Sequence, residues 1–231
     1  MDTNRKTAII IGALFLISYL GVFAGPALYS PVLDSPEYLA NTYPERTRVI
    51  AGILIELLND AAVIGIAVMF FPILKKQSER LALWLVGFRI VEAVTLVIGK
   101  ISALSLIGVS RQYLEAGSPD SSPFQALGAS ILSGRHWAGQ MTAVFFILGA
   151  LIFYDLLYRS KILPRFIPVW GFIAIALLIA GNLIGDLGVS QEFQPVMLLY
   201  LPIVLNELFL AVWLIAKGFN ASANILQPEH A

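Results

Sequence analysis

The chain contains six long apolar stretches, and no other feature of the sequence constrains its fold as strongly. The hydrocarbon core of a bilayer is about 30 Å thick, so an α-helix crosses it with about 20 residues. Membrane barrels have shorter strands in which apolar and polar residues alternate, and these stretches lack that alternation. We therefore predict an all-α, polytopic bundle of six transmembrane helices, at residues 7–28, 49–74, 81–109, 137–158, 166–189 and 195–216.

The overall composition agrees with a membrane protein and excludes several other classes. Hydrophobic residues make up 58% of the 231 positions and charged residues 13%, whereas soluble domains have about 25% charged residues. Lys and Arg total 15, as do Asp and Glu, so we predict no nucleic-acid partner. The absence of cysteine excludes disulfides, iron–sulfur clusters and cysteine-ligated zinc. The sequence predicts no metal site and specifies no cofactor or catalytic residue.

The distribution of Lys and Arg predicts the orientation, because cytoplasmic loops carry the excess of these residues. One side holds nine of them, namely Arg5, Lys6, Lys75, Lys76, Arg80, Arg159, Lys161, Arg165 and Lys217. The other side holds four, namely Arg46, Arg48, Arg111 and Arg135. We therefore predict that both termini lie in the cytoplasm, in one domain at residues 1–220 followed by a tail at 221–231.

The first apolar stretch has two interpretations, because Arg5 and Lys6 precede it and small residues follow near Ala24. A cleaved signal peptide would have these features and would leave five spans. A signal core usually has 7–15 apolar residues, and the stretch at 7–28 is longer. We therefore expect a retained helix.

Three segments together resemble a known family: Arg5 to Ala8, Tyr158 to Arg165 (YRSKILPR) and Glu207 to Asn220 (ELFLAVWLIAKGFN). With the pattern at Arg89 to Ala93, they are similar to the bacterial membrane family called domain of unknown function 4386. The resemblance covers nearly the whole chain and implies a multi-pass protein of the bacterial cytoplasmic (inner) membrane. It implies no reaction, cofactor or catalytic residue.

Polar and ionisable residues inside the predicted spans are the candidate functional residues. Such side chains are costly in hydrocarbon, at about 2.5–3.5 kcal/mol each on insertion scales, and usually face the interior of the bundle. In the second span, spacings of three and four residues place Glu56, Asn59 and Asp60 on one helical face. The rise per residue predicts a group near mid-depth, formed by Glu56, Asn59, Asp60, Arg89, Glu92, Asn206 and Glu207.

A second layer is expected nearer the outer boundary of the membrane. It is formed by Lys100, His136, Gln140, Asn182 and Asp186. His136 with Gln140 one turn later could suggest a metal ligand, but an isolated histidine at a membrane interface is more often solvated.

The charges at mid-depth do not balance in this prediction. Glu56, Asp60, Glu92 and Glu207 are four acids, and Arg89 is the one base assigned to the same level, where it could pair with Asp60. Either some of these carboxyls keep their protons at neutral pH, or a bound cation supplies the missing charge. The simpler alternative is that the polar residues form interhelical hydrogen bonds without binding anything.

Three functions remain open from the sequence. The favoured one is the binding or transport of a small cationic or lipid-like ligand through a carboxylate-rich intramembrane cavity, coupled to protons. A second is an intramembrane enzyme that modifies lipid, with paired carboxyls as acid and base. A third is an accessory or regulatory subunit of another membrane protein. The sequence specifies no oligomeric state.

Overall fold

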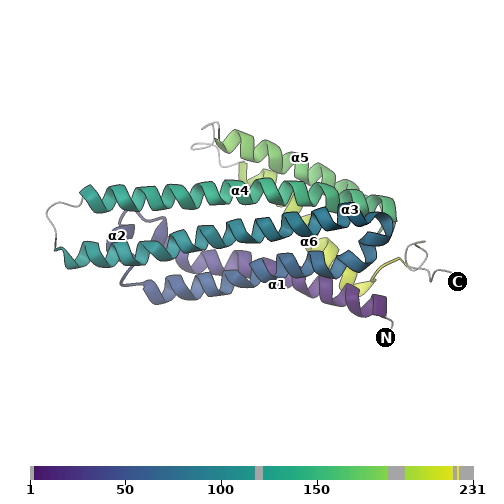
Figure 1. Cartoon of the computed structure of the whole chain (residues 1–231), viewed down its shortest axis with the longest axis horizontal. Helices are drawn as coiled ribbons and strands as arrows, with labels where there is room; N and C mark the ends of the chain where they lie inside the picture. Colours follow the sequence, from purple (N-terminus) through teal and green to yellow (C-terminus); the bar gives the residue numbers. More distant parts are fainter. Residues whose placement is uncertain (1–2, 118–121, 187–195, 221–222, 224–231) are drawn as a thin grey trace. The chain divides into compact units, whose positions relative to one another are not determined.

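Five long apolar helices make up most of the computed structural model, which describes residues 3–117, 122–186, 196–220 and 223 (Figure 1). The helices are α1 (Thr3–Leu33), α2 (Tyr38–Asn41), α3 (Arg46–Glu115), α4 (Ser122–Ser160), α5 (Phe166–Asp186) and α6 (Val196–Ala216). The described residues form no strand. The predicted all-α fold is therefore confirmed, and every helix except α2 is long and apolar enough to cross a membrane.

α3 is 70 residues long and consists of two helices that meet at Ser78. The backbone of Ser78 is extended, with φ −163° and ψ 108°. Its hydroxyl accepts a hydrogen bond from the Leu81 backbone N–H at 3.4 Å, the bond of an N-cap residue. The two parts, 46–77 and 79–115, each contain one of the two spans predicted in this region.

α4 begins earlier than the sequence predicts. The sequence predicts a span that starts at Trp137, but α4 is continuous from Ser122. Pro123 is the second residue of α4. Proline is well suited to the first turn of a helix, because the N–H that it lacks would have no intrahelical partner there. It therefore starts this helix and does not interrupt it.

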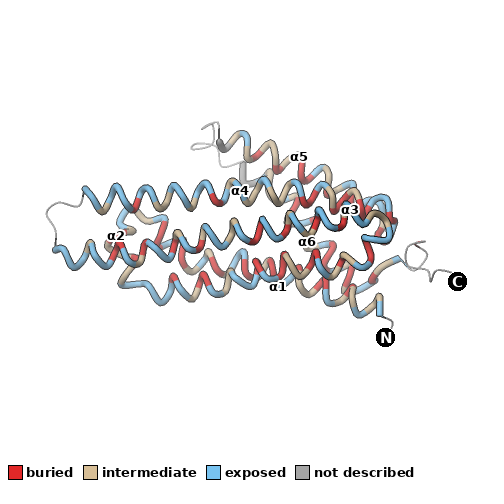
Figure 2. Tube along the Cα trace, in the orientation of Figure 1, coloured by how far each residue is buried: buried red, intermediate tan, exposed pale blue. Residues whose placement is uncertain are grey.

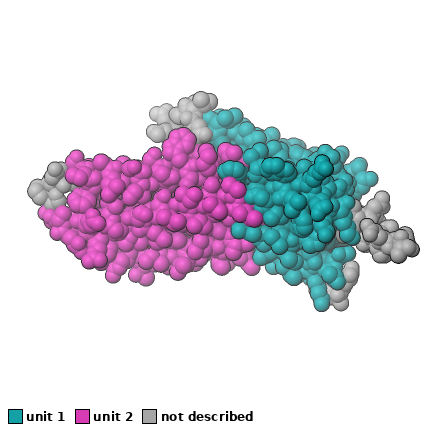
Figure 3. Space-filling model, in the orientation of Figure 1, with its two compact units in different colours: residues 1–16, 64–89, 145–231 teal, residues 17–63, 90–144 magenta. Residues whose placement is uncertain are grey.

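The chain folds into two compact units, which Figure 3 shows in different colours. Unit 1 contains residues 1–16, 64–89 and 145–231, and unit 2 contains residues 17–63 and 90–144. Both units contain parts of α1, α3 and α4.

Unit 1 has a core of aliphatic and aromatic side chains from α1, α3, α4, α5 and α6. α5 packs against α6, and Gly181 faces Tyr200 across this contact. At the end of α6, the Arg5 guanidinium donates hydrogen bonds to the carbonyls of Leu214 and Ile215, at 3.0 and 2.6 Å. The Ile215 carbonyl lies in the last turn of α6, where carbonyls lack a partner within the helix, and Arg5 supplies its donor.

Unit 2 has a smaller core where the end of α1 meets the first and last parts of α3. Val49 and Ile53 pack with Leu106, while Glu56 lies near Lys100, so the two parts of α3 are antiparallel here. In both units, buried and exposed residues alternate along each long helix, so each helix has a buried face and an exposed face (Figure 2).

The exposed faces of the helices carry large apolar side chains. Leu20, Leu54, Trp84, Ile173 and Leu198 each expose more than half of their surface. A water-soluble protein rarely exposes so many large apolar residues, whereas a bilayer solvates them. The outer surfaces of the helices are therefore suited to contact with lipid.

Candidate functional site

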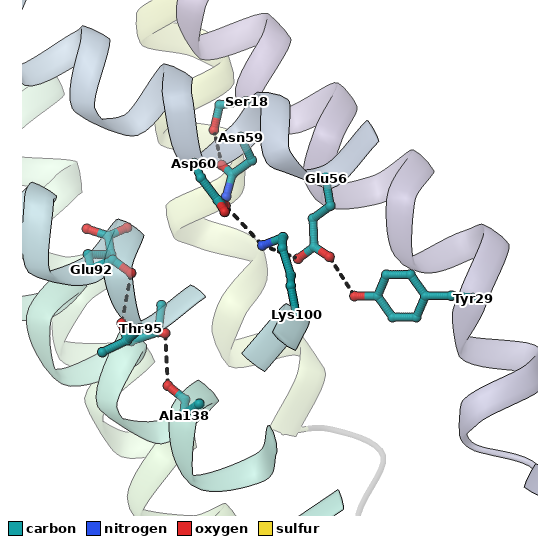
Figure 4. Close-up of polar contacts among 10 residues, drawn as sticks. Ser18, Tyr29, Glu56, Asn59, Asp60, Glu92, Thr95, Lys100 and Ala138 are labelled. Carbon is teal, nitrogen blue, oxygen red and sulfur yellow. Dashed lines mark hydrogen bonds and ion pairs between the residues drawn. The ribbon is translucent and has the colours of Figure 1, made fainter. Parts of the chain in front are cut away.

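Lys100 lies between two carboxylates of the same helix α3, inside unit 2 (Figure 4). Its ammonium Nζ donates to Asp60 Oδ1 at 3.0 Å and lies 3.3 Å from Glu56 Oε1. The side chains of Lys100, Asp60 and Glu56 expose only 6%, 7% and 12% of their surface. We call these three residues the acidic triad. It is a buried ion cluster with two carboxylates and one ammonium.

Two polar residues of α1 contact the acidic triad or the residue beside it. The Tyr29 hydroxyl donates to Glu56 Oε2 at 2.7 Å. The Ser18 hydroxyl donates to the Asn59 side-chain oxygen at 2.6 Å, next to Asp60 (Figure 4). Glu56, Asn59 and Asp60 thus present their side chains toward the same interior, which is the face that their spacing predicts.

The contacts of Lys100 with Asp60 and Glu56 differ from the predicted two-layer arrangement, which placed Lys100 in an outer layer above these carboxylates. From the outer end of its span at Val109, Lys100 is about 14 Å deep, between Glu56 at about 10 Å and Asp60 at about 16 Å. In addition, each side chain of a helix leans toward its own N-terminus. The antiparallel segments therefore direct Lys100 and Asp60 toward each other.

The two carboxylates differ in whether both of their oxygens have a donor. Glu56 has Lys100 at one oxygen and Tyr29 at the other. Asp60 has Lys100 at Oδ1, whereas Oδ2 is buried and accepts no hydrogen bond from any residue that the structure describes. An unsatisfied buried acceptor costs about 1–3 kcal/mol. The acidic triad therefore has an excess negative charge, and Asp60 contributes its one unused oxygen.

The polar contacts continue from Tyr29 toward the end of α1. The Arg135 guanidinium lies over the Tyr29 ring, 5.1 Å from its centroid. Arg135 also pairs with Asp34 at 3.6 Å. The Asp34 side chain is mostly exposed, so this sequence of contacts leads from the surface of unit 2 to the acidic triad.

A groove follows α1 on the surface of unit 2. It has a volume of about 550 Å³ and is lined by residues between Val22 and Pro31, together with Asp34. Glu56 and Asp60 are not among its lining residues. The groove is therefore separate from the acidic triad and is mainly apolar.

Glu92 is buried elsewhere in unit 2, on the later part of α3. Its backbone carbonyl accepts the Thr95 hydroxyl at 2.8 Å, and Thr142 of α4 donates to Thr95 at 2.9 Å. These hydroxyls connect α3 with α4 near Glu92 (Figure 4). Glu92 belongs to a polar helix contact in addition to any role in binding.

The other predicted mid-depth residues belong to unit 1. Arg89 is buried, with its guanidinium 4.9 Å from the centroid of the Phe146 ring. The Asn206 side chain accepts the Tyr154 hydroxyl at 2.7 Å and donates to the Ile167 carbonyl at 3.0 Å. Glu207 follows Asn206 and is also buried. Arg89 and Glu207 thus lie in one unit, and Asp60 and Glu92 in the other; that all four face one another stays a prediction.

The remaining residues of the predicted outer layer are not brought together by the contacts described. His136 is exposed, and its ring lies 5.6 Å from that of Trp137. Gln140 is partly buried. Asn182 donates to the Leu178 carbonyl of its own helix at 2.8 Å. The side chain of Asp186 lies outside the described part of the chain.

Sequence reasoning missed Tyr29 and Ser18, and assigned Lys100 to a different layer. Tyr29 was treated as the start of a loop, although α1 continues to Leu33. Ser18 has a hydroxyl that a helix can satisfy by itself, so it gives no strong signal in an apolar stretch. Among the described residues, no group of three or more His, Cys, Asp or Glu side chains could hold a metal ion.

Comparison with known proteins gives one match. A family model described as a domain of unknown function (DUF4386) matches residues 10–218. No curated protein and no solved structure matches the chain. The match covers α1 from Ile10, all of α2 to α6, and every residue of the acidic triad.

Proposed function

We propose that this chain, which belongs to the DUF4386 family of domains of unknown function, binds a small cation at the acidic triad and moves it across the bilayer. The observation that carries the proposal is the charge of that buried group. Two carboxylates surround one ammonium, and one oxygen of Asp60 has no donor among the described residues. A small cation would supply both the missing charge and the missing partner.

A purely structural role would favour a balanced pair. Burial of charged groups costs several kcal/mol for each ion, and a compensating partner offsets this cost. A second carboxylate beside the same ammonium adds a further charge without a further partner. Intramembrane acids of this kind commonly mark the pathways of ions and protons. The excess charge therefore supports binding more than helix packing alone.

The depth of the acidic triad supports transport. Asp60 is eleven residues from the start of its predicted span, about 16 Å in a hydrocarbon core about 30 Å thick. Transporters commonly bind their substrates near the midplane, where the site can be reached from either side in turn. Contacts of Tyr29, Arg135 and Asp34 extend from the triad toward one end of the span.

Binding can be tested with the purified chain in detergent at constant ionic strength. Sodium, potassium, calcium, methylammonium and protons are supplied in turn, and thermal unfolding is measured. A cation at about 100 times its Kd should stabilise the folded protein by about 2.7 kcal/mol. Asp60→Asn should abolish this effect, whereas Asp155→Asn, in an exposed pair with Arg159, should retain it. If no cation stabilises the wild type more than Asp60→Asn, the proposed function is wrong.

We further propose that the protein crosses the bacterial cytoplasmic membrane six times, with both termini in the cytoplasm. The nine-to-four distribution of Lys and Arg and the break of α3 at Ser78 support this topology. Reporter fusions after residues 74, 165 and 231 should all give a cytoplasmic signal. A periplasmic signal at any of the three positions would contradict the orientation.

A further inference from the structure

We infer that the cation bound at the acidic triad is a proton and that it binds to Oδ2 of Asp60. The inference rests on the proposed function, because it names the cation that the triad takes. Asp60 exposes 5% of its surface, and its Oδ2 is buried without a hydrogen-bond donor among the described residues. Once Asp60 is protonated it carries no charge, and the acidic triad is then neutral without any other ligand.

The number of oxygens available at the acidic triad favours a proton over a metal ion as the bound cation. Calcium takes six to eight oxygen ligands and magnesium an octahedral set, and both need several oxygens around one point. In the acidic triad, Oδ1 of Asp60 and both oxygens of Glu56 already have donors, at 2.7 to 3.3 Å. Lys100 occupies the position between the carboxylates that a metal ion would need. A proton binds to one oxygen, so the single unused oxygen of Asp60 is sufficient for it.

The contacts also select Asp60 over Glu56 as the group that takes the proton. Glu56 accepts from the Tyr29 hydroxyl at one oxygen and lies beside the Lys100 ammonium at the other. Hydrogen bonds to a carboxylate favour its charged form. Asp60 has an oxygen, Oδ2, with no donor among the described residues, and it is the more deeply buried of the two. The proton therefore adds to Oδ2 of Asp60.

The charge change on binding is small and local. The charged groups that face Asp60 are Lys100 from the later part of α3 and Glu56 from its own segment. Asn59 and, through it, Ser18 of α1 add neutral hydrogen-bonding groups. When one proton adds to Asp60, the net charge of the acidic triad changes from −1 to 0. The Lys100 ammonium is then balanced by Glu56 alone.

Infrared difference spectroscopy of the purified full-length protein can detect this proton, because protonated carboxylic acids have a carbonyl band that carboxylates lack. We expect a band of this kind to appear in the wild type as the pH is lowered. The part of the band that belongs to Asp60 should be lost in Asp60→Asn. It should remain in Asp155→Asn, whereas in Glu56→Gln it should need a lower pH to appear, because only one carboxylate is then left beside Lys100. Thermal unfolding of each variant checks that the fold is kept.

The same samples are then given sodium, potassium and calcium, so that the two proposals can fail separately. Loss of the band in Asp60→Asn, with no Asp60-dependent effect of the metal ions, would support the proton. Stabilisation by a metal ion that depends on Asp60, without an Asp60 band, would overturn the proton but uphold cation binding. Absence of both effects would overturn the proposed function as well.

Discussion

Lys100→Met is expected to lower the free energy of unfolding by about 3–5 kcal/mol, the usual cost of removing one partner from a buried ion pair. Methionine has a similar length and fills similar space, so the main change is the loss of the ammonium. Glu56 and Asp60 would then be two buried carboxylates without their shared cation. Unfolding of the purified protein in detergent, by heat or denaturant, measures the effect.

A compensating variant separates the loss of charge from any loss of packing. In Glu56→Gln/Asp60→Asn/Lys100→Met, all three charges of the acidic triad are removed together. Removal of one partner is costly because it leaves an uncompensated buried charge, and the triple variant leaves none. The triple variant should therefore recover most of the stability lost in Lys100→Met, although it contains the same methionine.

The pH dependence of the stability of Lys100→Met provides a second check that uncompensated charge causes the loss. At low pH its two carboxyls take up protons, and the uncompensated charge disappears. The folded state then binds more protons than the unfolded state at the same pH, so stability falls as pH rises. Lys217→Met, at an exposed lysine, should have little effect at any pH. Equal losses at Lys100 and Lys217, or no recovery at low pH, would contradict the importance of the triad.

The spans of this protein are predictable from the sequence, because each follows from a single physical requirement. A helix must satisfy its own backbone hydrogen bonds and cover about 30 Å of hydrocarbon. The segment 166–189 therefore stands out by length and hydropathy, and α5 begins at Phe166 as predicted. Helix ends outside the apolar stretch are less constrained. The early start of α4 at Ser122 is an example, since its first turns carry no comparable apolar signal.

The acidic triad is only partly predictable. The spacing of Glu56 and Asp60 fixes their common face, because residues four apart are neighbours on any α-helix. Their partner Lys100 is 40 residues from Asp60 in the chain, and its choice depends on the register of two antiparallel segments. Tyr29 adds a contact from a third segment. Such long-range choices depend on packing, which one sequence does not specify.

Two segments that suggest the family have a structural role. In the segment Tyr158 to Arg165, the Ile162 carbonyl accepts a hydrogen bond from the Asn220 backbone N–H at 2.8 Å. Ile162 and Leu163 are fully buried in the core of unit 1. Lys161 between the helices has a positive φ of 57°. These contacts join the α4–α5 connection to the end of α6, so the resemblance reports the fold and contains no information about chemistry.

Gly25→Val is expected to destabilise the protein strongly. A Cβ at Gly25 would lie 2.7 Å from the Gly52 carbonyl oxygen and 2.7 Å from Glu56 Cβ. A Cβ at Gly52 would in turn lie 2.6 Å from the Gly25 carbonyl oxygen. The two backbones therefore touch at this crossing, as in other membrane helix pairs with small residues at the contact. Backbone atoms cannot move aside as a flexible side chain can.

Valine at residue 25 should therefore force α1 away from α3, at a cost of about 1–3 kcal/mol or more. Thermal unfolding in detergent measures this loss, with Gly108→Ala of the same unit as control. A Cβ at Gly108 meets no atom within 4 Å, so that change should be neutral or stabilise its helix by up to about 1 kcal/mol. Equal tolerance of both substitutions would contradict the close crossing. Because Tyr29 follows Gly25 by one turn, the displaced α1 should also withdraw the Tyr29 hydroxyl from Glu56.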